Sequence, residues 1–462
     1  MLQPVNRLPP EIISRIVRYV PDNIPADTSQ IIPLTHVCRY WRELIVSTPE
    51  HWTSISAESS RDLAALSLER AKTAPLEIYL SASHMREVGW LHLLRPNIRE
   101  TRSLCVVGLQ SAREVTTAFR NFPLSTPNLQ SLKIVKSGNP DLRRSADPFE
   151  WSAHSLRHLT LEQVPLYPSF LNLRALTTLS LTNHDFDHHL DTVLDFLEEN
   201  HSLESVTLWV RFKTPALRSS RRRSPVKNQL RHLSVPCFEA TQTQALISNI
   251  ALQRGAHLEI AYCGRDARLK EILTGISTAH LSNLPSPTFI EYQIHRREIQ
   301  LSGSNGRFSF VGPPSLGDPF VELPILPLAN IRELRLRHRR SERVTSLIPS
   351  TLPLSFFPAL ETLAVECETS TPYLLFSLLS KPSSSPSLKT LAFLDCDLSD
   401  QFMEELTRFA SNRKNTTSAR LYHVVIVDSG GKFPSAASID ALEEHVPVVD
   451  ARRGTKLPAD LT

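Results

Sequence analysis

A six-residue pattern of the form L-x-x-L-x-L recurs along most of the chain and constrains its fold more than any other feature. Its matches are LQSLKI at 129, LRHLTL at 156, LTTLSL at 176, LESVTL at 203, LRHLSV at 230, IRELRL at 331, LETLAV at 360 and LKTLAF at 388. Most successive matches start 27 to 29 residues apart, with one step of 20. The last two apolar positions alternate as in a short strand that buries one face, so each match predicts a strand.

A period of this length with this pattern is typical of leucine-rich repeats, in which each unit adds one strand and one return segment to a curved parallel sheet. TRSLCV at 101 extends the series upstream, and PLEIYL at 75 is the expected first strand. Two return segments have helical periodicity, at 190–200 and 399–411, and Ser399 is the expected N-cap of the second. We therefore predict an α/β fold in which residues 56–462 form an irregular leucine-rich-repeat solenoid, a curved parallel sheet with helices.

The repeats depart from regularity in two ways. The position that regular repeats fill with Asn or Cys holds Cys396 in one repeat only, so we expect an irregular curve. Between about residues 265 and 330 the pattern fades, and IQLSGSNGRFSF at 299–310 predicts two strands joined by a tight turn at Asn305-Gly306.

The first 55 residues carry two amphipathic helical patterns instead. One spans residues 8–20, with Pro9 and Pro10 marking the start of its helix, and the other spans residues 34–45. Two helices this short cover each other only partly, and a module of about fifty residues is marginally stable alone. A partner surface is therefore expected at the N-terminal module.

Three short motifs of this module resemble those of a known family. LPPEI at 8–12, Leu34 with VCRYWR at 37–42, and STPEHW at 47–52 closely resemble the F-box of a large group of fungal F-box proteins. The resemblance covers a domain at 1–55, and PDNIPADTSQ at 21–30 lengthens the usual connection as an expected surface loop. It implies docking on the Skp-type adaptor, and through it on the cullin, of a ubiquitin ligase. The positions that match the docking face are Leu8, Pro9, Ile12, Ile13, Val37, Trp41 and Leu44.

Composition narrows the class of protein further. The formal net charge is +4, from 51 basic and 47 acidic residues. A charge this small does not indicate that the protein binds nucleic acid or a membrane through its overall electrostatic field. Six cysteines without CxxC spacing argue against a zinc site and a disulfide framework. No secretory leader or long apolar run is evident, and we expect a cytoplasmic or nuclear protein. No catalytic motif, metal site or cofactor loop is predicted, so the chain is expected to be non-catalytic.

These features together predict the substrate-recognition subunit of a Skp-cullin-F-box ubiquitin ligase, in which the repeats bind a target protein. One alternative is a protein-binding scaffold that does not promote degradation. Another is a nucleic-acid-binding repeat protein, favoured only by the arginine-rich stretches at 218–231 and 332–343 and disfavoured by their lack of interleaved aromatics.

The arginine-rich strand at 333–337 is the first candidate for the target-binding face. Alternation aims Leu334 and Leu336 inward and leaves Arg335 and Arg337 on the opposite face. We expect these arginines to stand clear of the neighbouring repeat, ready for an acidic or phosphorylated target. The alternative is a solvated face on which they pair with Glu333 and Glu366. The next candidate is the rim around Trp209 and Arg211.

Overall fold

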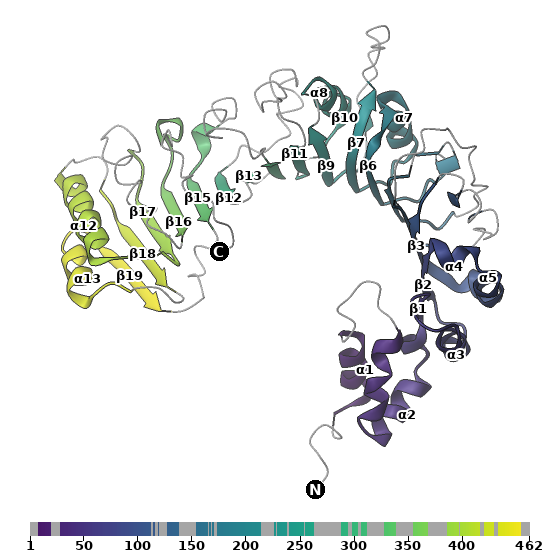
Figure 1. Cartoon of the computed structure of the whole chain (residues 1–462). Helices are drawn as coiled ribbons and strands as arrows, with labels where there is room; N and C mark the ends of the chain where they lie inside the picture. Colours follow the sequence, from purple (N-terminus) through teal and green to yellow (C-terminus); the bar gives the residue numbers. More distant parts are fainter. Residues whose placement is uncertain are drawn as a thin grey trace. The chain divides into compact units, whose positions relative to one another are not determined.

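The computed structural model divides the chain into two compact units, residues 1–230 and 231–462. The residues it describes are 8–19, 28–111, 114–115, 119, 127–137, 154–164, 166–167, 169–170, 173–213, 226–227, 229–237, 240–253, 255–262, 288–293, 298–303, 306–311, 328–338, 354–367, 386–396, 398–415, 420–428 and 433–453. Mixed α/β structure with a parallel sheet and a helical N-terminal region is present, in agreement with the predicted class (Figure 1).

Unit 1 begins with helices and continues as a sheet. Its α-helices are α1 (Pro10–Tyr19), α2 (Arg39–Ser47), α3 (Arg61–Ala71), α4 (Ala82–Arg86), α5 (Val88–Leu94) and α7 (Leu190–Glu199). Short 3-10 helices are η2 (Thr28–Ile31), η3 (Pro33–His36), η4 (Pro49–Trp52) and η5 (Arg95–Glu100). The strands are β1 (Ser54–Ser56), β2 (Leu76–Ser81), β3 (Thr101–Leu109), β4 (Ser131–Lys136), β5 (His158–Glu162), β6 (Thr178–His189), β7 (Ser205–Lys213) and β8 (Val226–Lys227).

The strands of unit 1 follow chain order in the sheet. From β1 to β7 each strand pairs in parallel with the next. The register places Leu132, Leu159 and Leu179 opposite one another, and all three are buried. The strands and inward leucines expected from L-x-x-L-x-L are thus confirmed here. PLEIYL forms a strand as expected, β2, but it is not the first one, because the short strand β1 precedes it and pairs with it.

Unit 2 contains the helices α8 (Ala240–Ser248), α12 (Asp400–Asn415) and α13 (Ala436–Glu443), with the 3-10 helices η9 (Leu328–Asn330) and η10 (Leu354–Phe356). Its strands are β9 (His232–Cys237), β10 (Ile250–Ala251), β11 (His257–Tyr262), β12 (Phe289–Gln293), β13 (Glu298–Gly303), β14 (Gly306–Val311), β15 (Glu333–His338), β16 (Thr362–Cys367), β17 (Thr390–Leu394), β18 (His423–Asp428) and β19 (Val448–Arg453).

The sheet of unit 2 departs from chain order once. Strand β13 is antiparallel to both β12 and β14, so the two strands expected around Asn305-Gly306 are confirmed. Strand β12 then pairs in parallel with β15, and β15 to β19 continue in parallel and in chain order. The antiparallel insertion explains why the leucine pattern fades between residues 265 and 330.

The helices at the end of unit 2 cover one side of its sheet. Ser399 Oγ accepts a hydrogen bond from the backbone N–H of Phe402, as expected of the cap of α12. The Phe402 ring packs edge-on against Phe393 of β17, with 5.1 Å between ring centroids. Helices α12 and α13 lie side by side (Figure 1). The face of β17 that carries Phe393 is therefore the core side.

One predicted helix is interrupted. Residues 34–45 were expected to form a single helix, but η3 ends at His36 and α2 begins at Arg39. Cys38 between them has extended backbone angles, and its Sγ accepts a hydrogen bond from the Trp41 N–H at 3.5 Å. A side chain that caps the following turn competes with helical backbone at its own position.

Among the described residues no helix is long and apolar enough to cross a membrane.

Candidate functional site

Helix α1 divides its apolar residues between two adjacent stripes. Ile13 and Val17, four residues apart, are buried against the rest of the N-terminal module. Ile12, Ile16 and Tyr19 lie beside them at spacings of four and three and are exposed. The apolar arc of this helix is therefore wider than its own module covers.

The core of the N-terminal module is formed around two tryptophans. Trp41 and Ile45 of α2 are buried, and Trp52 Nε1 donates a hydrogen bond to the Ile45 carbonyl at 2.8 Å. The guanidinium of Arg70 in α3 lies over the Trp52 ring, 4.2 Å from its centroid. Thr28 is buried and donates a hydrogen bond to the Ser54 carbonyl. The end of the 21–30 segment is thus fixed to the module, and residues 21–27 lie outside the described ones.

The seven expected docking residues fall into two groups. Ile13 and Trp41 are core residues, the latter 5% exposed. Ile12 and Val37 are 43% and 50% exposed, Pro9 is exposed, and Leu8 and Leu44 are partly exposed. Only the second group is accessible to a partner, whereas the first can act by holding the second in place.

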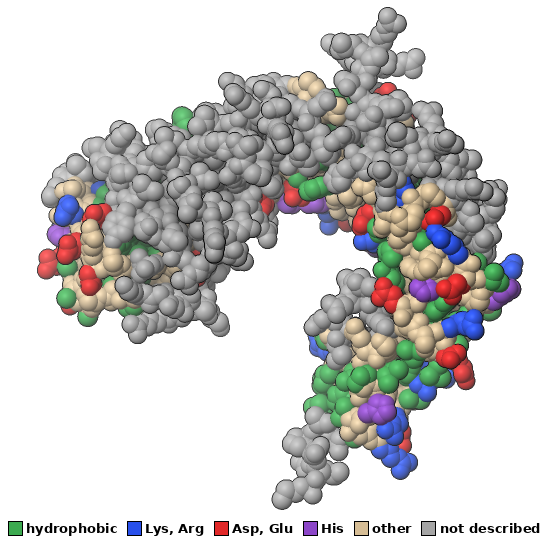
Figure 2. Space-filling view, viewed as in Figure 1, with side chains coloured by type: hydrophobic (Ala, Val, Ile, Leu, Met, Phe, Trp, Pro, Cys, Tyr) green, Lys and Arg blue, Asp and Glu red, His purple; other side chains and the backbone are tan. Residues whose placement is uncertain are grey.

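Helices α1 and α2 carry further exposed apolar side chains that were not predicted as docking residues. Ile16 and Tyr19 on α1 and Tyr40 and Val46 on α2 are all exposed. Figure 2 shows hydrophobic side chains gathered over the N-terminal helices. The spacing of Ile12, Ile16 and Tyr19 would have revealed this second stripe, since Ile13 and Val17 already suffice for a core stripe. Exposed apolar side chains in such a group are typical of an interaction surface.

The sheet provides the second candidate surface. We call the side of each sheet opposite to its core side the outer face. On the outer face of unit 1, β2 to β7 carry a continuous row of partly exposed residues, which are Tyr79, Cys105, Lys133, Thr160, Ser180 and Thr207. This face is therefore accessible across six strands.

The charges on this outer face are locally compensated. Lys133 Nζ lies 2.6 Å from Glu162 Oε1, and the hydrogen bond that Lys133 donates to this carboxylate raises the pKa of Lys133. Burial raises the pKa of the Cys105 thiol to about 11, and the nearby positive charge of Lys133 offsets only part of this shift. Burial also raises the pKa of Tyr79, with a contribution from Glu58. A thiol with so high a pKa is a poor nucleophile at neutral pH.

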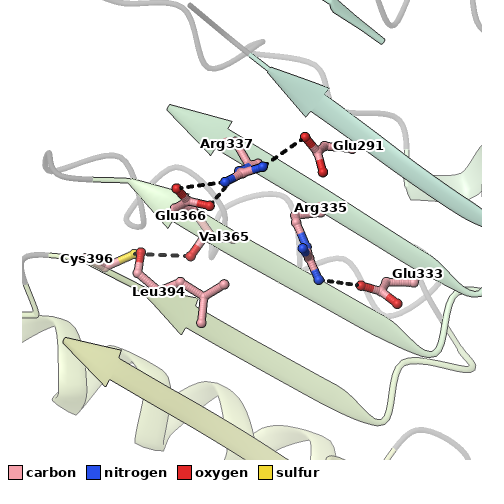
Figure 3. Close-up of polar contacts among 8 residues, drawn as sticks. All are labelled: Glu291, Glu333, Arg335, Arg337, Val365, Glu366, Leu394 and Cys396. Carbon is pink, nitrogen blue, oxygen red and sulfur yellow. Dashed lines mark hydrogen bonds and ion pairs between the residues drawn. The ribbon is translucent and has the colours of Figure 1, made fainter. Parts of the chain in front are cut away.

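The arginine-rich strand β15 has its charges paired (Figure 3). Arg337 Nε lies 2.6 Å from Glu366 Oε2 on β16, and its Nη1 lies 3.2 Å from Glu291 Oε1 on β12. Arg335 Nη2 lies 3.3 Å from Glu333 Oε1, and its guanidinium lies 5.5 Å from the centroid of the Phe289 ring. Burial acts to lower the pKa of Arg337, but the hydrogen bonds and charges of Glu366 and Glu291 raise it above the ordinary value.

This network corrects the expectation that the two arginines stand clear of their neighbours. The side chain of Arg335 is only 14% exposed, and that of Arg337 is 27% exposed. Glu366, predicted to lie opposite Arg337, engages it directly, and Glu291 adds a second carboxylate from a strand that sequence reasoning did not place there. The pairing with Glu333 and Glu366, considered above as the alternative, is the arrangement found.

The second pair of candidate target-binding residues lies on β7. Trp209 is partly exposed on the outer face, opposite Thr182 of β6 in the register. The backbone of Arg211 follows on the same strand, opposite Asp187, and its side chain is not among those described. The structure thus places Trp209 beside the accessible row of unit 1, whereas Arg335 and Arg337 belong to unit 2.

Comparison with curated proteins finds no match to this chain. The model of the F-box-like family matches residues 5–58, a span that contains α1, η2, η3, α2, η4 and β1. The chain therefore carries an F-box-like domain at residues 5–58.

Proposed function

We propose that the chain is a substrate-recognition subunit of a Skp-cullin-F-box ubiquitin ligase. The F-box-like domain docks on a Skp-type adaptor, and the strands and helices that follow form an irregular leucine-rich-repeat solenoid that binds a target protein. The observation that supports this proposal best is the exposed apolar group on α1 and α2, which lies within the family match and which the module's own core leaves uncovered.

Docking on the adaptor uses the accessible apolar side chains, while the tryptophans hold the helices in position. Ile12 and Val37 are the central contacts because each presents an apolar side chain on a helix or turn fixed by a buried neighbour. Burying such side chains removes apolar surface from water, which favours association. Ile16 and Tyr40 extend the contact.

Target binding uses the outer face of unit 1. This face is accessible over six strands, and Trp209 offers a large aromatic side chain of the kind that dominates binding energy at protein interfaces. Arg335 and Arg337 are weaker candidates, since a target carboxylate or phosphate must compete with Glu333, Glu366 and Glu291. By holding a target beside the ligase the chain raises its effective concentration, and other subunits perform the ubiquitin chemistry.

Capture of a purified Skp-type adaptor by the full-length chain tests the first half of the proposal. Ile12→Asp combined with Val37→Asp should abolish capture while the thermal unfolding midpoint stays nearly unchanged, because both side chains are exposed. Val88→Asp is the matched control, as Val88 on α5 is 64% exposed but lies outside the F-box-like domain. Undiminished capture by the double variant would exclude this surface as the docking site.

A second experiment tests the target-binding half. Proteins captured by the chain are compared, by mass spectrometry with and without cullin inhibition, between the natural sequence and Trp209→Ala. The proposal expects a set of proteins that accumulates on cullin inhibition and is lost from the variant. Capture without any change in target half-life when the chain is removed from cells would favour a scaffold that does not promote degradation.

A further inference from the structure

Strand β19 lies beside β18 at one edge of the sheet of unit 2 and leaves its apolar side chains only partly covered (Figure 1). Its core-side residues Val449 and Ala451 lie opposite Val424 and Ile426 of β18 in the register. The two β18 side chains are fully buried, whereas Val449 and Ala451 are partly exposed. Val448, on the outer face, is 52% exposed. The side chains of β19 therefore lack the cover that a further strand gives to those of β18.

The backbone of β19 presents hydrogen-bonding groups along the edge that faces away from β18. Among the described residues, the parallel pairing with β18 is the only ladder of this strand. The Val448 N–H donates to the Tyr422 carbonyl at 3.1 Å, so the backbone groups of Val448 point toward β18. Because this direction alternates from residue to residue, Val449, Ala451 and Arg453 direct their N–H and C=O groups to the opposite edge.

We propose that this edge pairs with the same edge of a second copy of the chain, in an antiparallel arrangement centred on Ala451. Two residues opposite each other in an antiparallel pair alternate between exchanging both backbone hydrogen bonds and exchanging none. A two-fold axis at Ala451 places this residue opposite its counterpart and Val449 opposite Arg453 of the second copy. These three residues are the ones whose backbone groups point to the edge, so every hydrogen bond of the new ladder can form.

The charges of β19 favour the same register. Asp450 and Arg452 lie on the outer face, with side chains 22% and 59% exposed, and Arg452 Nε is 2.6 Å from Asp450 Oδ1 within the strand. Centring on Ala451 places Asp450 opposite Arg452 of the second copy, and Arg452 opposite Asp450. Opposite charges directly across an antiparallel pair stabilise it. Centring on Val449 instead would place Asp450 opposite Val448 and lose both cross-strand ion pairs.

A two-fold pairing of this kind closes on itself. Both copies use the same edge, so neither keeps that edge of β19 free for a third chain. On the core side Ala451 packs against its counterpart, and Val449 packs against the aliphatic part of Arg453, which covers the apolar side chains left partly exposed. The dimer would carry two F-box-like domains. The pairing depends on neither adaptor docking nor target binding.

Analytical ultracentrifugation of the full-length chain tests the pairing. The natural sequence should sediment as a dimer at micromolar concentration and as a monomer on dilution. Asp450→Arg should weaken association about tenfold or more, because it places two arginines opposite each other twice in the interface. Arg452→Asp should do the same. Arg408→Asp is the matched control, since Arg408 is an exposed residue of α12 and its reversal should leave the dimer unchanged.

Charge exchange makes the test specific to the register. An equimolar mixture of the Asp450→Arg and Arg452→Asp chains should form dimers again, because each arginine then faces an aspartate. The double variant with both substitutions should dimerise by itself for the same reason. A natural chain that stays monomeric at every concentration would overturn the proposal, as would a mixture of the two variants that fails to restore the dimer.

Hydrogen exchange, resolved to single amides by fragmentation mass spectrometry, tests the edge itself. The amides of Val449, Ala451 and Arg453 should be protected in the dimer and should lose that protection on dilution or in the Asp450→Arg chain. The Val424 amide of β18 serves as the control and should stay protected throughout. Protection of the three edge amides that persists in the monomer would show that another part of the same chain occupies the edge, and this result would overturn the proposal.

Discussion

Arg337 and Glu366 lie directly opposite each other on β15 and β16 and form a bidentate ion pair. Arg337 Nε is 2.6 Å from Oε2 of the carboxylate, and Nη2 is 3.4 Å from Oε1. On the other side of Arg337, Glu291 of β12 supplies a second carboxylate that is itself buried. The guanidinium therefore joins three strands across the point where the antiparallel insertion meets the parallel strands.

Arg337→Ala should lower the free energy of unfolding by about 1–3 kcal/mol, because it leaves two carboxylates partly buried without their cation. Urea denaturation followed by circular dichroism measures this change. Lys389→Ala is the control, since its ion pair with Glu361 is largely exposed and should contribute less than about 1 kcal/mol. Equal stability losses in the two variants would contradict a structural role for Arg337.

Leu179→Asp should destabilise unit 1 by about 3 kcal/mol or more, since it buries an unpaired charge at a fully buried strand position. Ser180→Asp, one residue later on the accessible outer face, should cost less than about 1 kcal/mol. Limited proteolysis and thermal unfolding distinguish the two. A protease-resistant Leu179→Asp chain would show that this position tolerates solvent.

Trp41→Ala should lower the stability of the N-terminal module by about 3–5 kcal/mol, because it opens a cavity among buried neighbours. Adaptor capture is expected to disappear together with the protection of α1 and α2 amides from hydrogen exchange. Tyr40→Ala, at the adjacent and exposed position, should leave amide protection intact. If the Trp41 variant keeps full protection, the indole is not a core side chain.

Cys105 should give the chain a specific sensitivity to alkaline pH. Its folded-state pKa, about 11, is raised from the ordinary value of 9.0, so the stability contributed by the neutral thiol is fully present below pH 9.0 and is lost as the pH rises through about 11. The Cys105→Ala variant should lose less stability across this window. Because the pKa of Tyr79 is also raised, the comparison must be made between the two chains at each pH.

The same shift predicts slow chemistry at Cys105. Iodoacetamide should alkylate it about a hundredfold more slowly near pH 8 than an unperturbed thiol, in proportion to the smaller thiolate fraction. Peptide mapping after timed exposure gives the rate. A rate equal to that of a denatured control would show that burial does not suppress ionisation.

The leucine pattern predicted the strands of both units because period-two alternation and burial are set locally. Leu159, Leu179 and Leu334 are buried as expected, since a shift of one residue would have turned each strand's apolar set outward. The helix start at Cys38 could not be predicted, because the apolar residues before and after Cys38 follow one helical periodicity. Strand β1 is only three residues long and carries too little pattern to detect.

Only one of the two carboxylates that contact Arg337 on β15 could be predicted from the sequence. Glu366 could be placed opposite Arg337 because both belong to repeats of known spacing. Glu291 could not, since it lies 46 residues away on a strand reached through the antiparallel insertion. Likewise, the division of the α1 residues into a core stripe and an exposed stripe depends on which side α2 and η4 occupy, which the helix sequence alone leaves open.

The pairing of each strand in unit 1 with its sequence neighbours has a mechanical consequence. A pulling force applied to the two ends of this unit would load the hydrogen bonds of one strand pair at a time, because strands far apart in the sequence share no backbone contacts within the β1–β7 ladder. The sheet would then yield in a series of small extensions at low force, each releasing one strand with its return segment, instead of in a single rupture.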